Sequence, residues 1–122
     1  MVPITLEVPE ELADRLRPLE DWLPTVLELS LIGFHTLATA TATEVIGFLS
    51  NNPSPHDVLD YHVSERAQAC LQRLLALNEA GLLSEEEQQE LDELQRIEHI
   101  VILLKARVAK QLAIVQRECE RV

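Results

Sequence analysis

Two histidines and two aspartates lie close together in the sequence and could bind a metal ion. His56 and Asp60 are four residues apart, so a helix would place them on one face, with Asp57 and His62 nearby. Imidazole and carboxylate groups are zinc ligands when three or four of them converge on one point. The same residues follow Pro55, where they would cap and solvate a short helix. We favour this second interpretation and expect no metal site.

The other reactive side chains are too sparse to suggest catalysis. Cys70 and Cys119 have no partner at CxxC spacing, and Cys70 lies on an apolar stripe, where we expect a small core residue. His35 and His99 stand alone and are expected to be half-buried and hydrogen-bonded. The three glycines form no phosphate-binding loop. We therefore expect a non-enzymatic protein without a cofactor.

The chain of 122 residues is strongly acidic, which restricts its partners. It has 21 Asp and Glu against 10 Lys and Arg, a formal net charge of -11. Binding to DNA, RNA or an anionic membrane needs a basic surface, so we expect a basic protein rather than DNA as the partner. The most apolar stretch, 29–43, is short and contains four threonines, which predicts no membrane span. The absence of a signal-peptide pattern and of a disulfide framework predicts a cytoplasmic location.

Composition and apolar spacing predict a mainly α-helical fold that begins with a short strand. Hydrophobic residues make up 47% of the chain and aromatic residues only 3%, an aliphatic composition typical of packed helices. The first eight residues alternate apolar and polar side chains, which predicts the strand. Helices are then predicted over about 9–17 and 20–35. Thr41 with Glu44 predicts a capping box that starts a third helix.

A cluster of helix breakers divides the chain into two predicted units. The segment NNPSP, at 51–55, is the strongest breaker in the sequence. The first unit, 1–50, contains the predicted strand and three helices. The second unit, 51–122, begins with a helical turn and continues as two longer helices.

These two longer helices are predicted to form an antiparallel hairpin. Ser64 caps the first helix, which ends near Gly81. Ser84 and Glu87 form a capping box for the second helix, which continues without a breaker over 85–119. The connection of a few residues places the helices side by side in opposite directions.

Two features predict a homo-oligomer, most simply a dimer. A helix over 85–119 is about 50 Å long at 1.5 Å per residue, so it extends beyond a compact domain of this size. Its apolar residues recur at seven-residue spacing, and a lone strand leaves its backbone groups unpaired unless another copy pairs with it. The predicted self-association residues are Ile4, Leu6 and Val8 of the strand and Leu94, Val101, Leu104 and Val108 of the helix.

Basic residues form a stripe on the opposite face of the last helix. Arg96, Arg107, Lys110, Arg117 and Arg121 lie within about 80° of one another on a helical wheel. Such a stripe could contact nucleic-acid phosphates. A helix with a solvated outer face and basic final turns has the same pattern, and we favour that interpretation.

The opening sequence VPITLEVPEELADRL resembles the ribbon-helix-helix module of many antitoxins from bacterial toxin–antitoxin pairs. In that family two chains pair their strands, and outward strand side chains enter the DNA major groove. The resemblance therefore implies a ribbon-helix-helix-like dimer. Here Thr5 and Glu7 occupy the outward face, and Glu20 and Asp21 stand where the family contacts phosphates. These acids would repel DNA, so the resemblance implies dimerisation rather than operator binding.

The remainder of the chain is similar to short bacterial proteins, common in cyanobacteria, that are often encoded beside a small nuclease. The similar segments are Phe48-Leu49-Ser50, Pro53-Ser54-Pro55, Ser64-Glu65, Leu83-Ser84-Glu85-Glu86-Glu87 and Glu98-His99. These are caps and turns without reactive groups. The resemblance implies an antitoxin-like protein that restrains the nuclease.

An acidic protein suits such a partner, because a nuclease carries a cationic cleft for a polyanion. The expected partner-binding residues are the amino-terminal acids together with Glu85, Glu86, Glu87, Glu90 and Glu93. Two alternatives stay open. The chain could be a DNA-binding transcriptional autorepressor that uses the basic stripe, or a structural helical scaffold without a nuclease partner.

Overall fold

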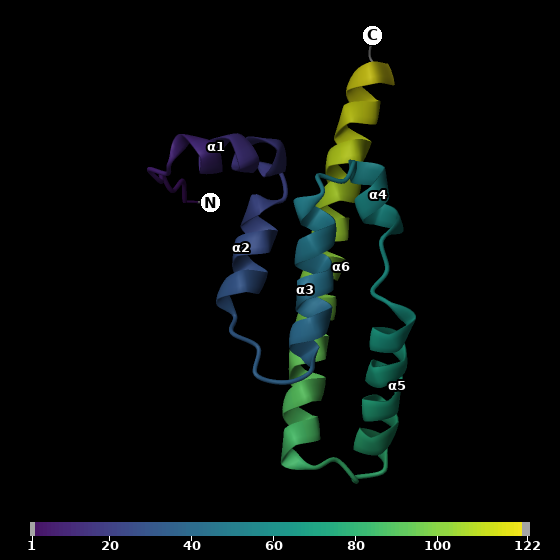
Figure 1. The fold of residues 1–122 in the computed structure, drawn as a ribbon. Helices are drawn as coiled ribbons and strands as arrows, with labels where there is room; N and C mark the ends of the chain where they lie inside the picture. Colours follow the sequence, from purple (N-terminus) through teal and green to yellow (C-terminus); the bar gives the residue numbers. More distant parts are fainter. Residues whose placement is uncertain (1, 121–122) are drawn as a thin grey trace.

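The computed structural model describes residues 2–120, and every regular element in that range is a helix (Figure 1). The elements are α1 (Glu10–Leu16), a single 3-10 turn η1 (Arg17–Leu19), α2 (Leu23–Leu31), α3 (Ala38–Ser50), α4 (Pro55–Asp60), α5 (Glu65–Glu79) and α6 (Glu85–Glu120). The mainly α-helical prediction is confirmed at this level.

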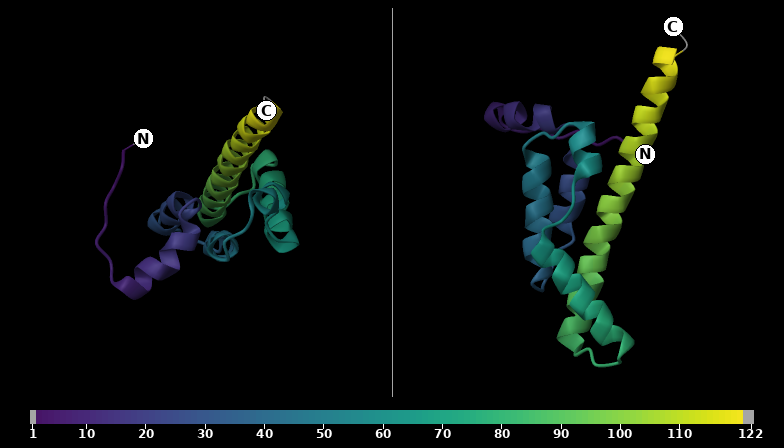
Figure 2. Two further views of the ribbon diagram at one scale, coloured as in Figure 1. Left: turned by 90° about the horizontal axis from the view of Figure 1, so that it is seen from above. Right: turned by 90° about the vertical axis from the view of Figure 1, so that its right-hand side faces the viewer.

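The predicted amino-terminal strand is wrong, and with it the ribbon-helix-helix-like fold class. Residues 2–9 form a stretched-out segment without regular structure, and 2–120 contains no strand (Figure 2). A strand needs a neighbour that pairs with its backbone N–H and C=O groups, and the described chain supplies none. Ile4 and Leu6 are 80% and 66% exposed, so the apolar alternation does not bury one face.

The second and third helices begin and end at other residues than predicted. α2 ends at Leu31 rather than near His35, because Gly33 has a φ of 71°, outside the helical region. α3 begins at Ala38, ahead of the predicted capping box, and Thr41 lies inside the helix with its side chain buried. Packing overrides the weak helix propensity of this Ala/Thr run, because its small residues let α3 lie close against the core.

The carboxy-terminal half follows the predicted start and stop signals. The Ser64 hydroxyl accepts a hydrogen bond from the Ala67 backbone N–H at 3.2 Å and caps α5. Gly81, with a φ of 71°, follows the end of that helix. The Ser84 hydroxyl and the Glu87 carboxylate each accept a 3.2 Å bond from the other's backbone N–H. α5 and α6 therefore form the predicted antiparallel hairpin (Figure 1).

One apolar core lies along α6 and receives side chains from α2, α3, α4 and α5. Leu49 of α3 and Leu74 of α5 are both 0% exposed, and Ile97 of α6 lies between the surrounding helices. The Trp22 indole N–H donates a 3.0 Å hydrogen bond to the Pro53 carbonyl, 31 residues away. This core includes residues from both predicted units, 1–50 and 51–122.

Three parts of the chain project from this body. The arm, residues 2–21, runs away from it, and α1 contains no buried residue and has its principal contacts with the adjoining η1 (Figures 1 and 2). The tip, residues 79–86, is the bend of the hairpin. At the other end, α6 extends past the remaining helices (Figure 1). None of the helices described in 2–120 has the length and apolar content needed to span a bilayer.

Candidate functional site

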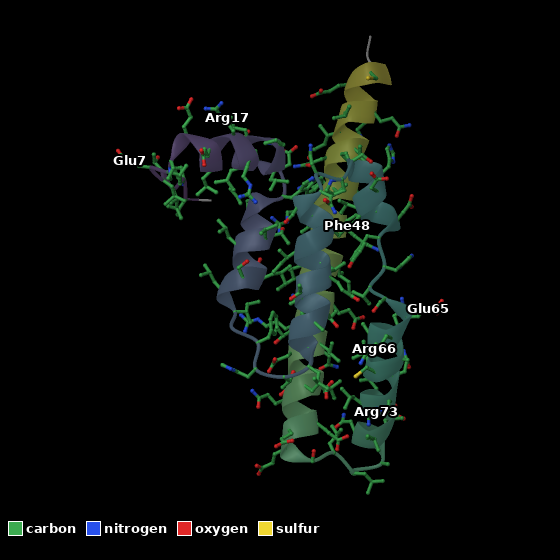
Figure 3. The ribbon with its side chains drawn as sticks, viewed as in Figure 1. Glu7, Arg17, Phe48, Glu65, Arg66 and Arg73 are labelled. Atoms are coloured by element: carbon green, nitrogen blue, oxygen red, sulfur yellow. The ribbon has the colours of Figure 1, made fainter. Side chains whose placement is uncertain are left out.

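The five acids predicted to bind a partner have different surroundings in the structure. Glu87 belongs to the cap of α6, and its Oε2 lies 3.6 Å from an Arg73 guanidinium nitrogen on α5. Arg73 projects from the lower half of α5 (Figure 3). Glu87 therefore connects the two hairpin helices, which favours a structural role for this side chain.

Glu90 is buried between the hairpin helices. It is 8% exposed, and its carboxylate accepts a hydrogen bond from the Cys70 thiol, with a distance of 3.3 Å between the sulfur and the oxygen. Burial, followed by the hydrogen bond and the charge of Glu90, raises the pKa of the Cys70 thiol. Cys70 is half-buried in contact with the core, where a protonated thiol is a weak nucleophile.

Glu93 holds the loop between α2 and α3. One carboxylate oxygen accepts three hydrogen bonds, from the His35 backbone N–H at 2.9 Å, the Thr36 backbone N–H at 3.2 Å and the Thr36 hydroxyl at 3.1 Å. This contact spans 58 residues of sequence. The sequence shows no signal for it, because neither the loop nor its distance from α6 follows from local spacing.

Glu85 and Glu86 are the two predicted acids that remain exposed without a recorded intrachain hydrogen bond or ion pair among the described residues. They lie at the tip beside Leu82, which is 69% exposed, and Glu79. The tip thus combines one exposed leucine with three exposed carboxylates, while the neighbouring Leu83 packs against the core. The sequence holds no signal for this combination, because Leu82 follows a turn glycine and belongs to no apolar stripe.

The predicted self-association residues also divide into two groups. Leu94, Leu104 and Val108 are buried, and Val101 is half-buried, against the helices of the same chain. Ile4 and Leu6 are exposed on the arm, and Val8 is half-buried. The apolar seam of α6 is therefore covered within one chain from Leu94 to Val108, whereas Val115 and the apolar side chains Ile4 and Leu6 of the arm are exposed.

The basic stripe is exposed along the outer face of α6. Arg96, Arg107, Lys110 and Arg117 are all exposed, and Arg121 lies outside the described residues. Leu103 and Ile114, both 46% exposed, share this face, as follows from their helical spacing. We call the following five residues the outer stripe: Leu103, Arg107, Lys110, Ile114 and Arg117.

The His/Asp cluster around α4 caps the helix, as favoured above. Asp57 accepts a 3.1 Å bond from the Ser54 backbone N–H, and its own N–H donates to the Ser54 hydroxyl at 3.1 Å. His56, Asp60 and His62 are exposed. Within 2–120, no three His, Cys, Asp or Glu side chains lie close enough to hold a metal ion.

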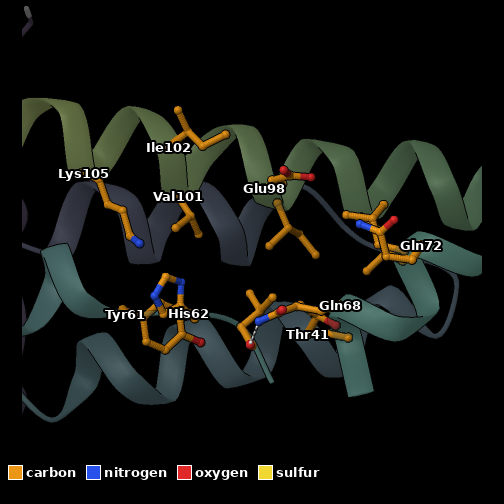
Figure 4. Close-up of a pocket in the computed structure, with 14 residues that line it drawn as sticks. Thr41, Tyr61, His62, Gln68, Gln72, Glu98, Val101, Ile102 and Lys105 are labelled. Carbon is orange, nitrogen blue, oxygen red and sulfur yellow. Dashed lines mark hydrogen bonds between the residues drawn. The ribbon is translucent and has the colours of Figure 1, made fainter. Parts of the chain in front are cut away.

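A groove of about 350 Å³ lies between α5, α6 and the linker after α4 (Figure 4). Apolar side chains such as Val101 form its walls, and Lys105 reaches from α6 toward the side where Tyr61 and His62 lie. Tyr61 stacks on Phe48, with ring centroids 4.2 Å apart. Burial, and then the negative charge of Glu44, raises the pKa of the Tyr61 phenol. The groove can take an apolar group, but it contains no nucleophile paired with a base.

Comparisons with known proteins identify no relative whose function could guide the interpretation of these surfaces. No protein-family model, no curated protein and no solved structure matches it.

Proposed function

We propose that this chain is a non-enzymatic, antitoxin-like protein whose hairpin tip binds the cationic cleft of a small nuclease. The observation that carries the proposal is the exposed Leu82 among the unpaired carboxylates of Glu79, Glu85 and Glu86, within the described chain. The sequence resemblance to proteins encoded beside a nuclease supplies the class of partner.

The chemistry of the tip fits a cleft that otherwise holds a nucleic acid. Carboxylates that enter such a cleft meet the Lys and Arg side chains that bind phosphates. Leu82 would add apolar contact at the centre of the interface, where desolvation strengthens the surrounding ion pairs. The two helices of the hairpin hold the tip away from the body, so the tip can enter a concave site (Figure 1).

The net charge of -11 supports the same proposal at longer range. An acidic protein and a basic protein attract each other before contact, and this increases the association rate at low salt. Binding should therefore weaken as the salt concentration rises.

The experiment is co-purification of the chain with the product of the neighbouring gene, which the resemblance implies to be a small nuclease, with nuclease activity as a second readout. We expect the wild-type chain to bind and inhibit the enzyme. Glu85→Lys/Glu86→Lys should weaken binding at least tenfold, about 1.4 kcal/mol. Leu82→Ser should weaken it less.

Two matched controls separate the tip from general effects of charge and apolar area. Glu28→Lys/Glu44→Lys reverses two exposed acids on the body, and Leu31→Ser removes an exposed leucine from α2. Both controls should bind as the wild-type chain does. Wild-type affinity in the tip variants, or failure of the wild-type chain to bind the nuclease, would contradict the proposal.

DNA-binding autorepression is a second candidate, favoured by the exposure of the basic stripe on α6. It predicts that the chain retards DNA from upstream of its own gene in a gel. Arg107→Glu/Lys110→Glu should abolish that retardation and its salt dependence. A helical scaffold without a nuclease partner is the third candidate, and it predicts no capture of the nuclease by any variant.

A further inference from the structure

We propose that two copies of this chain pair by exchanging arms, with the acidic arm of each copy lying on the outer stripe of the other. The proposal concerns surfaces other than the hairpin tip, so it stands independently of the function proposed above.

Within residues 2–120, no other segment covers the apolar side chains at the start of the arm. Val2, Ile4 and Leu6 are exposed, Leu12 of α1 is 39% exposed, and α1 has no buried residue. Helices as short as α1 are marginal in water unless they pack against something. In Figure 3, Glu7 and Arg17 lie on the arm, well away from Glu65 and Arg66 of α5. The arm is thus an amphipathic segment with an uncovered apolar side.

The outer stripe is likewise not covered by any other described segment. Its residues follow one another at i, i+4, i+7, i+11 and i+14, so they form one continuous line on α6. Apolar Leu103 and Ile114 alternate along this line with exposed basic side chains.

Opposite charges identify the arm as the occupant of the outer stripe. Residues 2–21 contain six Asp and Glu against two Arg, and all eight side chains are exposed. The outer stripe contains three basic residues, Arg107, Lys110 and Arg117, and no Asp or Glu. An acidic segment with exposed aliphatic side chains therefore meets a basic segment with exposed aliphatic side chains. Outside the arm and residues 103–117, the basic residues of the described chain are Arg66, Arg73 and Arg96, and Arg73 is paired with Glu87.

The lengths of the two segments also agree. The outer stripe spans about 21 Å at 1.5 Å per residue. Residues 2–9, when extended, span about 23–26 Å at 3.3 Å per residue. Residues 2–9, with Glu7, can therefore follow the whole stripe, and α1, which carries Glu10 and Glu11, can pack at one end of it.

A second copy is the partner because each chain carries both halves of the contact. Two-fold pairing places each arm on the other chain's stripe, so the contact forms twice in a closed dimer. Each chain then contributes an arm and a stripe, which approaches the roughly 20–30 residues a side of a standard interface. In the single chain the arm leaves the body on the side of α2 and does not cover α6 (Figure 2).

Charge reversal on the full-length chain tests the proposal by light scattering after size exclusion. We expect the wild-type mass to be twice the chain mass of 13.8 kDa. Glu10→Lys/Glu11→Lys and Lys110→Glu/Arg117→Glu should each lower the mass to that of a single chain. The first variant leaves the arm with four acidic and four basic residues, and the second leaves the stripe with two Glu and one Arg, so each removes the opposite charge from one half of the contact. High salt should likewise weaken the wild-type dimer.

An equimolar mixture of the two variants is the decisive measurement. In a mixed dimer, the arm that carries Glu10→Lys/Glu11→Lys in one variant would lie on the stripe altered in the other, so that the new basic and acidic residues attract. The second contact joins an unaltered arm and an unaltered stripe. The mixture should therefore regain the double mass. Circular dichroism checks that each variant keeps its helices. Glu85→Lys/Glu86→Lys, which reverses charge at the tip, should leave the dimer intact.

Three results would overturn the arm exchange. They are a monomeric wild-type chain, a dimer that survives both charge reversals, and a dimer that mixing the two variants does not restore. A dimer that forms normally while the nuclease remains unbound would contradict only the function proposed for the tip.

Discussion

The body and the projecting parts of this protein use the same residue types in opposite ways. In the body, Leu49 and Leu74 are fully buried, and acids such as Glu90 and Glu93 bind partners within the chain. In the arm and the tip, Leu6 and Leu82 face solvent near Glu7, Glu85 and Glu86, which have no hydrogen bond or ion pair within the described residues. Residue type alone therefore does not separate a core position from a binding position. The difference lies in whether the chain itself covers the side chain.

A matched pair of leucine replacements should show the largest difference between the two regions. Leu49→Ala removes a side chain that is 0% exposed and should reduce the free energy of unfolding by about 2–5 kcal/mol. Leu6→Ala, on the arm, should change it by about 0.5 kcal/mol or less. Urea denaturation followed by the fluorescence of the single tryptophan, Trp22, measures both.

Both replacements are made in the Glu10→Lys/Glu11→Lys background, so that pairing of chains does not contribute to stability. If Leu6→Ala destabilised the single chain as much as Leu49→Ala does, the arm would belong to the body. The distinction between a stable body and an arm that adds little to the free energy of unfolding would then be wrong.

A matched pair of glutamate replacements on α6 should give a smaller difference. Glu93→Ala removes the acceptor of three hydrogen bonds from the loop at 35–36 and should cost about 1–3 kcal/mol. Glu86→Ala, at the tip, removes an exposed carboxylate and should cost less than about 1 kcal/mol. Urea denaturation gives both values, and hydrogen exchange at His35 and Thr36 reports loosening of the loop. Equal costs would show that Glu93 does not anchor the loop.

The two cysteines provide the smallest and most local contrast. Cys70 is half-buried and its pKa is raised by burial and by Glu90, whereas Cys119 is exposed near the end of α6. At neutral pH iodoacetamide should therefore alkylate Cys119 several-fold faster than Cys70, as mass spectrometry can measure. Glu90→Gln removes the negative charge beside the thiol and should accelerate alkylation of Cys70. An unchanged rate would contradict the contact between Cys70 and Glu90.

The same raised pKa gives the sign of a pH effect on stability. Folding favours the protonated Cys70 thiol, so its contribution is complete below the ordinary pKa of 9.0. That contribution is lost as the pH rises through the raised pKa of the folded chain. The Tyr61 pKa is also raised, so its ionisation acts in the same direction at still higher pH.

Sequence patterns predicted the parts of the fold that depend on a few neighbouring residues. Ser64, Ser84 and Gly81 mark the hairpin correctly, because a cap or a left-handed turn needs only local backbone groups. Local patterns predicted the amino-terminal strand wrongly, because a strand is stable only beside a pairing neighbour. They also predicted Thr41 wrongly as a helix cap, because it lies inside α3 with its side chain in the core.

The candidate sites also combine features set by neighbouring residues with features set by contacts between distant segments. The sequence by itself determined the acidic charge, the basic stripe and the long helix that carries it, because charge and helical spacing are properties of consecutive residues. Only the tertiary structure decided which acids form hydrogen bonds within the chain, since Glu90 and Glu93 accept theirs from residues 20 and 58 positions away. It also decided that the α6 seam is covered while the arm and the outer stripe are not. Burial is set by contacts between distant segments, and no local pattern records them.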